Sequence, residues 1–168
     1  MVVTGGTRRL GRIIAEAVAA DGYDIVATHS GENQIDSAEL SDFRGHIEDR
    51  YGVDCVTVWA DLSDPDPGTI MRVLNVAPSP LFGLVNNAGM FKYDDLATLE
   101  RARVEDTLAL NLVAPMLLTS AFSRAVGQRP GIVVFMLDQK IANPYPDHLT
   151  YTVAKGALHM LLTMCARR

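Results

Sequence analysis

Tyr151 and Lys155 lie four residues apart in the stretch Tyr151-Thr152-Val153-Ala154-Lys155. On a helix this spacing places both side chains on one face, about 5–6 Å apart at Cβ. A phenol ordinarily titrates near pH ~10, and a neighbouring ammonium favours the phenolate and lowers that pKa. The pair therefore predicts a proton donor or acceptor that works near neutral pH. Taken alone, the spacing equally fits an ordinary surface helix, so the rest of the chain must decide.

A glycine-rich loop, Thr4-Gly5-Gly6-Thr7-Arg8-Arg9-Leu10-Gly11, stands near the start of the chain. A helix N-terminus offers unpaired N–H groups and a partial positive charge, and glycines let the backbone approach a phosphate closely. Arg8 and Arg9 add donors suited to phosphate. A structural turn would explain the glycines alone. The loop's place after an apolar strand and before an amphipathic helix predicts dinucleotide binding. The predicted contacts are Gly5, Thr7, Arg8, Arg9, Leu10 and Gly11.

The end of the second apolar run indicates which dinucleotide is bound. An acidic residue at that point would bind the ribose 2′-hydroxyl of NAD. The run instead ends Ala27-Thr28-His29-Ser30, and the first acid is Glu32. His29 and Ser30 can donate to a 2′-phosphate, which favours NADP(H) over NAD(H). The alternative is that both are ordinary loop residues.

Apolar runs alternate with helical patterns along the chain, which predicts β/α units in a parallel sheet. Because the strands are continuous apolar runs, the sheet needs helices on both faces. We therefore expect one Rossmann-like, doubly wound, three-layer α/β/α domain over residues 1–168. The expected strands are 1–4, 23–28, 53–60, 81–86 and 132–137. Six helices are expected: one that begins near Leu10, one over 35–51 with Phe43 and Ile47 inward, a short one that ends near Val76, and three over 95–108, 111–126 and 150 onward.

The composition narrows the functional classes. The 168 residues are 48% hydrophobic and 21% charged, and the net charge is −5, which argues against a nucleic-acid partner. Cys55 and Cys165 form no metal spacing and no disulfide framework, so no metal is expected. We see no signal-peptide layout and no apolar run of membrane-spanning length. A cytoplasmic protein with a small-molecule substrate and no membrane partner is the expectation.

Five ordered motifs resemble the short-chain dehydrogenase/reductase family over nearly the whole chain. That family has a Thr-Gly-x-x-x-Gly-x-Gly loop, an adenine contact after the third strand, Asn-Asn-Ala-Gly after the fourth, a helix asparagine and Tyr-x-x-x-Lys. The matching residues here are Thr4, Gly5 and Gly11, Asp61-Leu62, Asn86-Asn87-Ala88-Gly89, Asn111, and Tyr151 with Lys155.

The resemblance implies hydride transfer from NADPH to an electrophilic carbon, with Tyr151 as the proton donor. Lys155 would lower the pKa of Tyr151 and bind the nicotinamide ribose. Asn111 would hold a water that links Lys155 to solvent. The implied adenine and ribose contacts are Asp61, Leu62, Asn87, Ala88 and Gly89. The implied catalytic set is Asn111, Asp138, Tyr151 and Lys155.

Two departures resemble the pteridine reductase branch of the family. Arg9 replaces the middle glycine of the loop, and Asp138 stands where the catalytic serine is expected, 13 residues before Tyr151. In that branch an aromatic residue at the position of Phe91 stacks on the pterin. The implied substrate contacts are Arg9, Phe91, Asp138 and Tyr151. Phe91 as a loop anchor is the alternative, and Gly89 departs from the serine that the branch tends to have.

Asp138 bears most directly on the substrate. An ionised carboxylate only accepts hydrogen bonds. It would repel a developing alkoxide, whereas a pterin presents ring and amino N–H donors. A protonated Asp138 would instead pass a proton to a ring nitrogen beside Tyr151, and a strand-end aspartate that caps N–H groups is the non-catalytic alternative. The other functions considered are a ketone or 3-oxoacyl reductase and a catalytically weak nucleotide-binding or oligomerisation module.

Members of the family usually continue well past the catalytic helix, whereas this sequence stops at Arg167-Arg168. We therefore expect a truncated version of the family fold. The family commonly forms dimers and tetramers through its two long helices, and the apolar last helix agrees with a homodimer or homotetramer. His46, His148 and His159 are interpreted as surface or packing residues.

Overall fold

The computed structural model describes residues 1–30, 37–77 and 80–166, and its strands form one parallel sheet. The order across the sheet is β3-β2-β1-β4-β5. The strands are β1 (Val2–Val3), β2 (Ile25–His29), β3 (Cys55–Trp59), β4 (Gly83–Asn86) and β5 (Ile132–Phe135). This is a doubly wound order, in which ligands bind outside the carboxyl ends of the strands where the order reverses. That point lies between β1 and β4, because β2 and β4 flank β1 on opposite sides.

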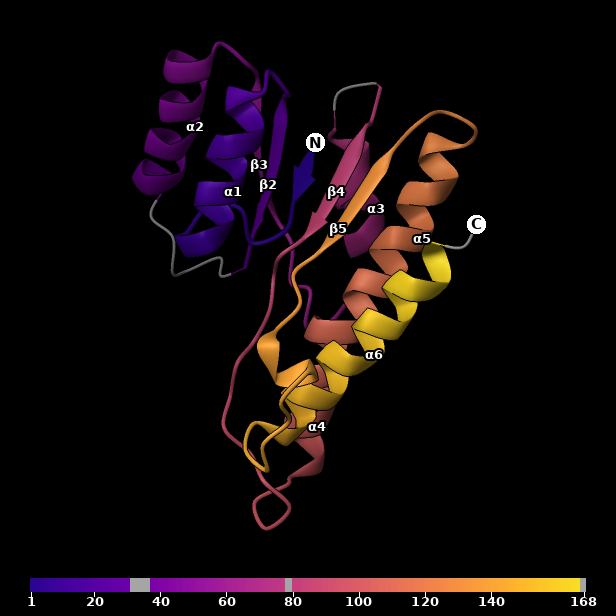
Figure 1. The fold of residues 1–168 in the computed structure, drawn as a ribbon. Coiled ribbons are helices and arrows are strands. Elements are labelled where there is room, and N and C mark those ends of the chain that lie inside the picture. Colours follow the sequence, from indigo (N-terminus) through magenta and orange to yellow (C-terminus); the bar gives the residue numbers. More distant parts are fainter. Residues whose placement is uncertain (31–36, 78–79, 167–168) are drawn as a thin grey trace.

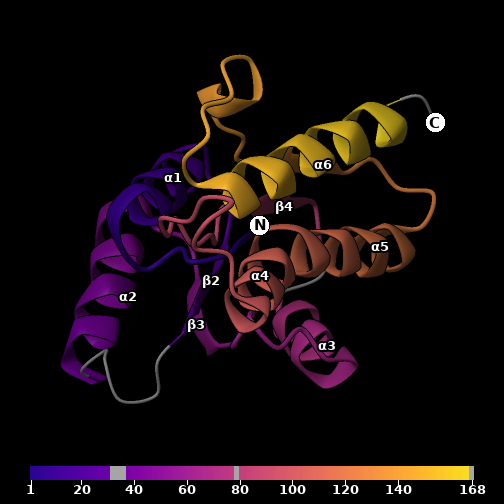
Figure 2. The same ribbon diagram turned by 90° about the horizontal axis from the view of Figure 1, so that it is seen from below.

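Helices cover both faces of the sheet, which confirms the three-layer prediction. They are α1 (Arg9–Ala20), α2 (Ser37–Tyr51), α3 (Pro67–Asn75), α4 (Arg101–Leu108), α5 (Ala114–Val126) and α6 (Leu149–Cys165). Figure 2 shows α1 and α2 on one side of the strands and α3, α5 and α6 on the other. In Figure 1, α6 lies alongside α4 and α5, with which it is in contact.

The two faces of the sheet bury separate apolar clusters. Successive strand residues point to opposite faces, so Val2 packs with α3 and α5 while Val3 packs with α1 and α2. Phe43 and Ile47 of α2 are 1% and 0% exposed, as predicted. Residues 35 and 36 of the predicted second helix lie outside the described residues, as does Glu32. Burial on both faces explains why the strands read as unbroken apolar runs.

The first helix approaches the sheet through small side chains. Gly11, Ala15 and Ala19 are its buried residues, whereas the larger apolar residues Leu10 and Ile13 are 51% and 64% exposed. The helix expected to begin near Leu10 is confirmed, but its buried face is made of these small residues. This leaves Leu10 at the surface, beside the glycine-rich loop.

The two helices expected at 95–108 and 111–126 form one continuous helix that begins later. Asp95 accepts hydrogen bonds from the backbone N–H groups of Ala97 and Thr98 at 2.9 Å, which makes residues 95–98 a turn. The helix starts at Arg101 and runs through the π-helical segment η1 (Ala109–Val113) into α5. The prediction of a start at Asp95 and of a break before Asn111 was therefore wrong.

Within the described residues, one helix is long and apolar enough to cross a bilayer by length and composition: the 26 residues Arg101–Val126. The sequence analysis did not anticipate it. Its Leu118 and Phe122 pack in the core cluster beneath the sheet, which is the packing of a core helix. The cytoplasmic location stays a prediction.

Candidate active site

A groove of about 660 Å³ lies at the carboxyl ends of the strands and gathers nearly all of the predicted site residues. The predicted residues that line it are Gly5, Thr7, Arg8, Arg9, Leu10, Gly11, His29, Ser30, Asp61, Leu62, Asn87, Ala88, Gly89, Phe91, Asp138, Tyr151 and Lys155. Asn111 is the predicted residue that does not line it, because it is 0% exposed behind the groove. The volume is in the range of small-molecule sites, about 300–1,000 Å³.

Further residues line the groove that the sequence analysis did not single out. They are Thr28, Ala60, Ser63, Met90, Leu110, Met136 and Leu137. Most of them adjoin a predicted residue or follow the carboxyl end of a strand. Their position at that edge of a parallel sheet was the available signal.

The glycine-rich loop is held against the segment after β4 by Thr4 and Thr28. The Thr4 hydroxyl oxygen accepts hydrogen bonds from the N–H groups of Asn87 and Ala88, each at 2.9 Å. Thr28 accepts the Gly5 N–H at 3.0 Å through its hydroxyl oxygen. Gly5 has φ +61°, a left-handed conformation that favours glycine. These bonds fix the loop at the point where the strand order reverses.

Gly11 permits the close contact between α1 and this loop. A Cβ at Gly11 would lie 2.0 Å from the Gly5 carbonyl oxygen and 2.6 Å from Asn87 Nδ2. No side chain can occupy that position without moving backbone. The glycine of the motif is therefore required by packing, as the dinucleotide-binding interpretation expects.

Arg9 adopts a left-handed backbone conformation, with φ +49°. Its position is the one where the family motif has a glycine. A non-glycine residue in this region is strained, and such strain concentrates at functional sites. Arg9 therefore holds its guanidinium at the groove at a conformational cost.

Arg8 and His29 form the outer, basic end of the groove. Arg8 pairs with Glu39 at the start of α2, with Nε–Oε1 at 2.9 Å and an Nη2–Oε2 contact at 2.6 Å. Nδ1 of His29 is buried and makes no hydrogen bond to any described residue. Burial, and then the charge of Arg8, lower the pKa of His29, so its neutral form is favoured.

Tyr151 donates a hydrogen bond to Asp138 at the inner end of the groove. Tyr151 Oη lies 2.9 Å from Asp138 Oδ2, and Asp138 Oδ1 accepts the backbone N–H of Lys140 at 2.9 Å. The Lys140 N–H, and then the Tyr151 hydroxyl, hold the pKa of Asp138 below its usual value. The lowered pKa favours the ionised carboxylate of Asp138 over the protonated-aspartate alternative.

The predicted effect of Lys155 on Tyr151 is wrong in this structure. Burial raises the pKa of Tyr151 above the usual tyrosine range, and the hydrogen bond and negative charge of Asp138 raise it further. Lys155 Nζ instead donates to the Met136 carbonyl oxygen at 2.7 Å and lies 5.6 Å from the centroid of the Tyr151 ring. Burial lowers the pKa of Lys155 itself. Tyr151 is thus a protonated phenol beside a carboxylate.

Asn111 ties the long helix to the loop after Gly89. Its Nδ2 donates to the carbonyl oxygens of Thr107 and Met90, both at 3.0 Å, and its Oδ1 accepts the Met90 N–H at 3.2 Å. Asn111 lies within the π-helical segment η1, so its amide also joins this segment to the preceding turn of α4. A Cβ at Gly89 would lie 2.9 Å from Asn111 Oδ1 and 3.9 Å from Lys155 Nζ. Asn111 and Lys155 therefore meet around Gly89.

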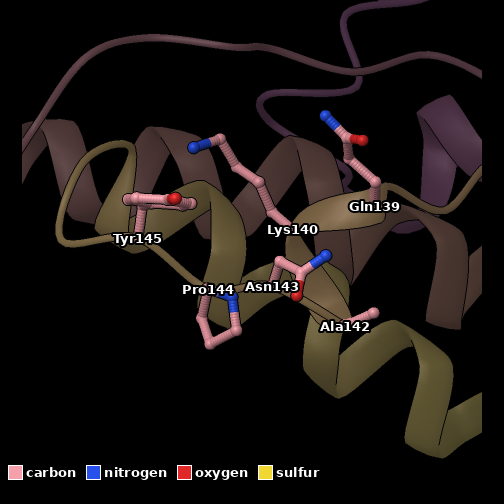
Figure 3. Close-up of a pocket in the computed structure, with 6 residues that line it drawn as sticks. All are labelled: Gln139, Lys140, Ala142, Asn143, Pro144 and Tyr145. Carbon is pink, nitrogen blue, oxygen red and sulfur yellow. The ribbon is translucent and has the colours of Figure 1, made fainter.

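A second hollow, of about 630 Å³, lies beside Asp138 in the loop that leads to α6. In Figure 3 the side chains of Gln139 and Lys140 extend to one side of this loop, away from Ala142 and Pro144. Lys140 Nζ forms an ion pair with Asp147 at 2.6 Å. This pair joins the beginning of the loop to the residues just before α6.

Comparison with known proteins finds several reductases that are similar to this chain. A family model for short chain dehydrogenases matches residues 1–168. Pteridine reductase 1 of Leishmania tarentolae is 28% identical over 205 residues, covering 98% of this chain and 69% of that protein. A 3-oxoacyl-[acyl-carrier-protein] reductase of Staphylococcus aureus is 26% identical over 169 residues, covering 99% and 66%.

A solved structure gives the same fold with a nucleotide present. The FolM alternative dihydrofolate reductase 1 from Brucella canis, complexed with NADP, matches with a TM-score of 0.83 at 29% identity, covering 94% of this chain and 62% of that one. The chain spans 60% to 66% of the length of other curated relatives, which include an L-xylulose reductase of Caenorhabditis elegans.

Proposed function

Because this chain belongs to the short-chain dehydrogenase family, we propose that it is an NADPH-dependent reductase of a pterin-like substrate, with Tyr151 as the proton donor. The observation that carries the proposal is the hydrogen bond of 2.9 Å from the Tyr151 hydroxyl to Asp138. It joins a protonated phenol to an ionised carboxylate. The pair offers a proton and a hydrogen-bond acceptor at one point of the groove.

The residues at the outer end of the groove fit NADP(H). Arg8 and Arg9 line it beside the N-terminus of α1, where backbone N–H groups and the helix dipole favour an anion. Nδ1 of His29 is a buried polar atom without a partner among the described residues, and His29 lines the groove. His29 and Ser30 line it where an acidic residue would bind the ribose 2′-hydroxyl of NAD, which supports NADP(H) over NAD(H). Asp61 and Leu62 would hold the adenine, and Asn87, Ala88 and Gly89 the ribose.

Tyr151, Lys155 and Asn111 would move the proton. When bound, NADPH supplies the hydride. Tyr151 would give its proton to the atom beside the carbon that accepts the hydride. Lys155, which lies 5.6 Å from the centroid of the Tyr151 ring, would bind the nicotinamide ribose beside it. Asn111 would hold the loop after Gly89 in position next to Lys155, through its hydrogen bonds to the Met90 backbone.

Asp138 supports a substrate that carries N–H donors. Its two oxygens accept one bond each from Lys140 N–H and from Tyr151. A carboxylate has about four acceptor positions, so it can accept further N–H groups. A pterin carries such donors on its ring and amino group, whereas an alkoxide forming from a ketone would be repelled. Phe91, at the groove's edge and 56% exposed, would contact the flat face of the ring.

A ketone or 3-oxoacyl reductase is the second candidate. The Staphylococcus aureus relative and the L-xylulose reductase support it, because their names describe carbonyl substrates. The Tyr151–Lys155 pair serves either chemistry. A third candidate is a nucleotide-binding or oligomerisation module of low activity.

NADPH oxidation with a dihydropterin, a quinonoid pterin, a 3-oxoacyl thioester and a simple ketone, measured in parallel, tests the proposal. We expect turnover with a pterin that exceeds turnover with the ketone and the thioester. Turnover with ketone or thioester alone would reject the pterin substrate. NADPH binding without any turnover would favour the binding module.

We also propose that the protein assembles as a homodimer or homotetramer through the two long helices. Apolar residues on the outer faces of α5 and α6 support this: Met116, Leu117, Val153, Met160 and Met164 are exposed. Covering such a face removes apolar surface from water. Sedimentation of the purified chain should give a mass of two or four protomers, and a monomer at all concentrations would refute the assembly.

A further inference from the structure

Three aromatic side chains meet at the mouth of the groove. The ring of His148 stacks on Phe91 with centroids 3.8 Å apart and planes 8° from parallel. Phe91 in turn meets the Tyr151 ring edge to face, with centroids 4.7 Å apart and planes at 81°. Tyr93 closes the outer side of His148 at 5.6 Å in an edge contact. A continuous line of ring contacts therefore runs from His148 to the proton donor.

The ring of His148 is fixed in place from two directions. Its Nδ1 lies 2.9 Å from the Lys92 carbonyl oxygen. Since a carbonyl only accepts, Nδ1 carries the proton of this bond. The His148 backbone is left-handed, with φ +48°, at the N-cap of α6. Histidine is one of the few side chains that tolerate this conformation.

The loop that carries Phe91 is fastened to the same helix end. The carboxylate of Asp94, which is buried, accepts the Thr150 N–H at 3.2 Å, and its backbone carbonyl accepts the Leu149 N–H at 3.3 Å. These bonds satisfy donors in the first turn of α6. Phe91 and Tyr151 therefore share one rigid support, in which His148 is the contact that sets the plane of the Phe91 ring.

We propose that His148 is a specificity-determining residue that clamps Phe91 in the orientation needed to hold a flat aromatic substrate against Tyr151. This inference rests on the proposed function. Phe91 is 56% exposed, and an exposed ring without a stacking neighbour has several side-chain rotamers open to it. The His148 ring covers part of Phe91 and removes that freedom. A flat substrate gains from a fixed ring, whereas a small aliphatic ketone does not.

Two substitutions separate the clamp from a structural role. His148→Asn keeps a side-chain donor and the tolerance for a left-handed backbone but removes the ring. His148→Phe keeps a stacking ring. His159→Ala is the matched control, because His159 is an exposed histidine on the same helix. For each protein, NADPH affinity, binding of 6-methyl-7,8-dihydropterin and the KM for the pterin and for acetoacetyl thioester are measured.

His148→Asn should weaken pterin binding about 3- to 10-fold, the size of one aromatic stacking contact, and raise the KM for the pterin to the same extent. NADPH affinity and the KM for the thioester should stay at wild-type values. His148→Phe should restore pterin binding, and His159→Ala should change nothing. If the wild-type protein binds the pterin and His148→Asn binds it equally well, the role of His148 is refuted while the proposed function stands. If the wild-type protein binds no pterin, the proposed function fails and the clamp with it. Equal losses for pterin, thioester and NADPH would show a structural role and overturn the proposal.

Discussion

Asp138→Asn should lower the pKa of Tyr151 without moving the phenol. Asparagine has the same shape but no charge, and its one carbonyl oxygen can keep the Lys140 N–H while its NH2 group faces the phenol oxygen and donates to it. The wild-type carboxylate accepts the Tyr151 hydroxyl at 2.9 Å and, after burial, is the cause of the raised pKa of Tyr151. A hydrogen bond to a charged group contributes about 1.5–3 kcal/mol. At about 1.4 kcal/mol per pKa unit, the pKa of Tyr151 should fall by about one to two units.

The assay is a titration of tyrosinate absorbance at alkaline pH. The chain has five tyrosines, so Tyr151→Phe and the double variant Asp138→Asn/Tyr151→Phe isolate the signal of Tyr151 by difference. In the wild-type protein this signal should appear last, above the usual tyrosine range. In Asp138→Asn it should appear one to two units earlier, still delayed by burial. An unchanged or higher pKa in Asp138→Asn would refute the account of the pair.

Asn111→Ala leaves backbone groups without their buried partner, so it should lower the free energy of unfolding in denaturant titration by about 2–4 kcal/mol. Arg9→Gly removes a side chain from a left-handed position and should raise the free energy of unfolding by about 1 kcal/mol, while calorimetry shows weaker NADPH binding because a phosphate donor is lost. Gly11→Ala places a Cβ 2.0 Å from the Gly5 carbonyl oxygen, so the loop must move and NADPH binding should be lost in the same calorimetric assay. The pKa of Asp138 is lowered by folding, so the ionised carboxylate stabilises the fold above the usual pKa of about 3.9, and this stabilisation is lost as the pH falls through the folded value. In acid unfolding, the free energies of unfolding of the wild-type protein and of Asp138→Asn should therefore differ less below that pH than above it.

The sequence predicted the sheet and the groove well because both follow from local patterns. Unbroken apolar runs ending in small or polar residues located the carboxyl ends of the strands, and parallel strands bring those ends to one edge. Thr28 and Met136 escaped attention although they lie at the same edge. The Thr28 hydroxyl accepts a bond from Gly5, and the Met136 backbone carbonyl accepts one from Lys155. Neither residue type indicates such a role in a sequence.

Features that depend on particular side-chain contacts, both local and between distant segments, were mispredicted. The expected start of a helix at Asp95 failed because that side chain bonds to the N–H groups two and three residues ahead. The expected break before Asn111 is a π-turn, which the amide of Asn111 stabilises through Met90 of another loop. The pKa of Tyr151 was expected to be lowered because a spacing of four residues says nothing of Asp138. His148 was interpreted as a surface or packing residue, and its ring does pack on Phe91; the partner itself could not be predicted because Phe91 is far away in the sequence.

The comparison of wild-type protein with Tyr151→Phe in a single turnover of NADPH oxidation tests the central claim most directly. The variant removes one hydroxyl from a ring that is already packed, so NADPH affinity should stay within about twofold of wild type, while the loss of the proton donor should slow reduction of the dihydropterin by about 100-fold or more. A Tyr151→Phe protein that oxidises NADPH with the pterin at the wild-type rate would contradict the assignment of Tyr151 as the proton donor.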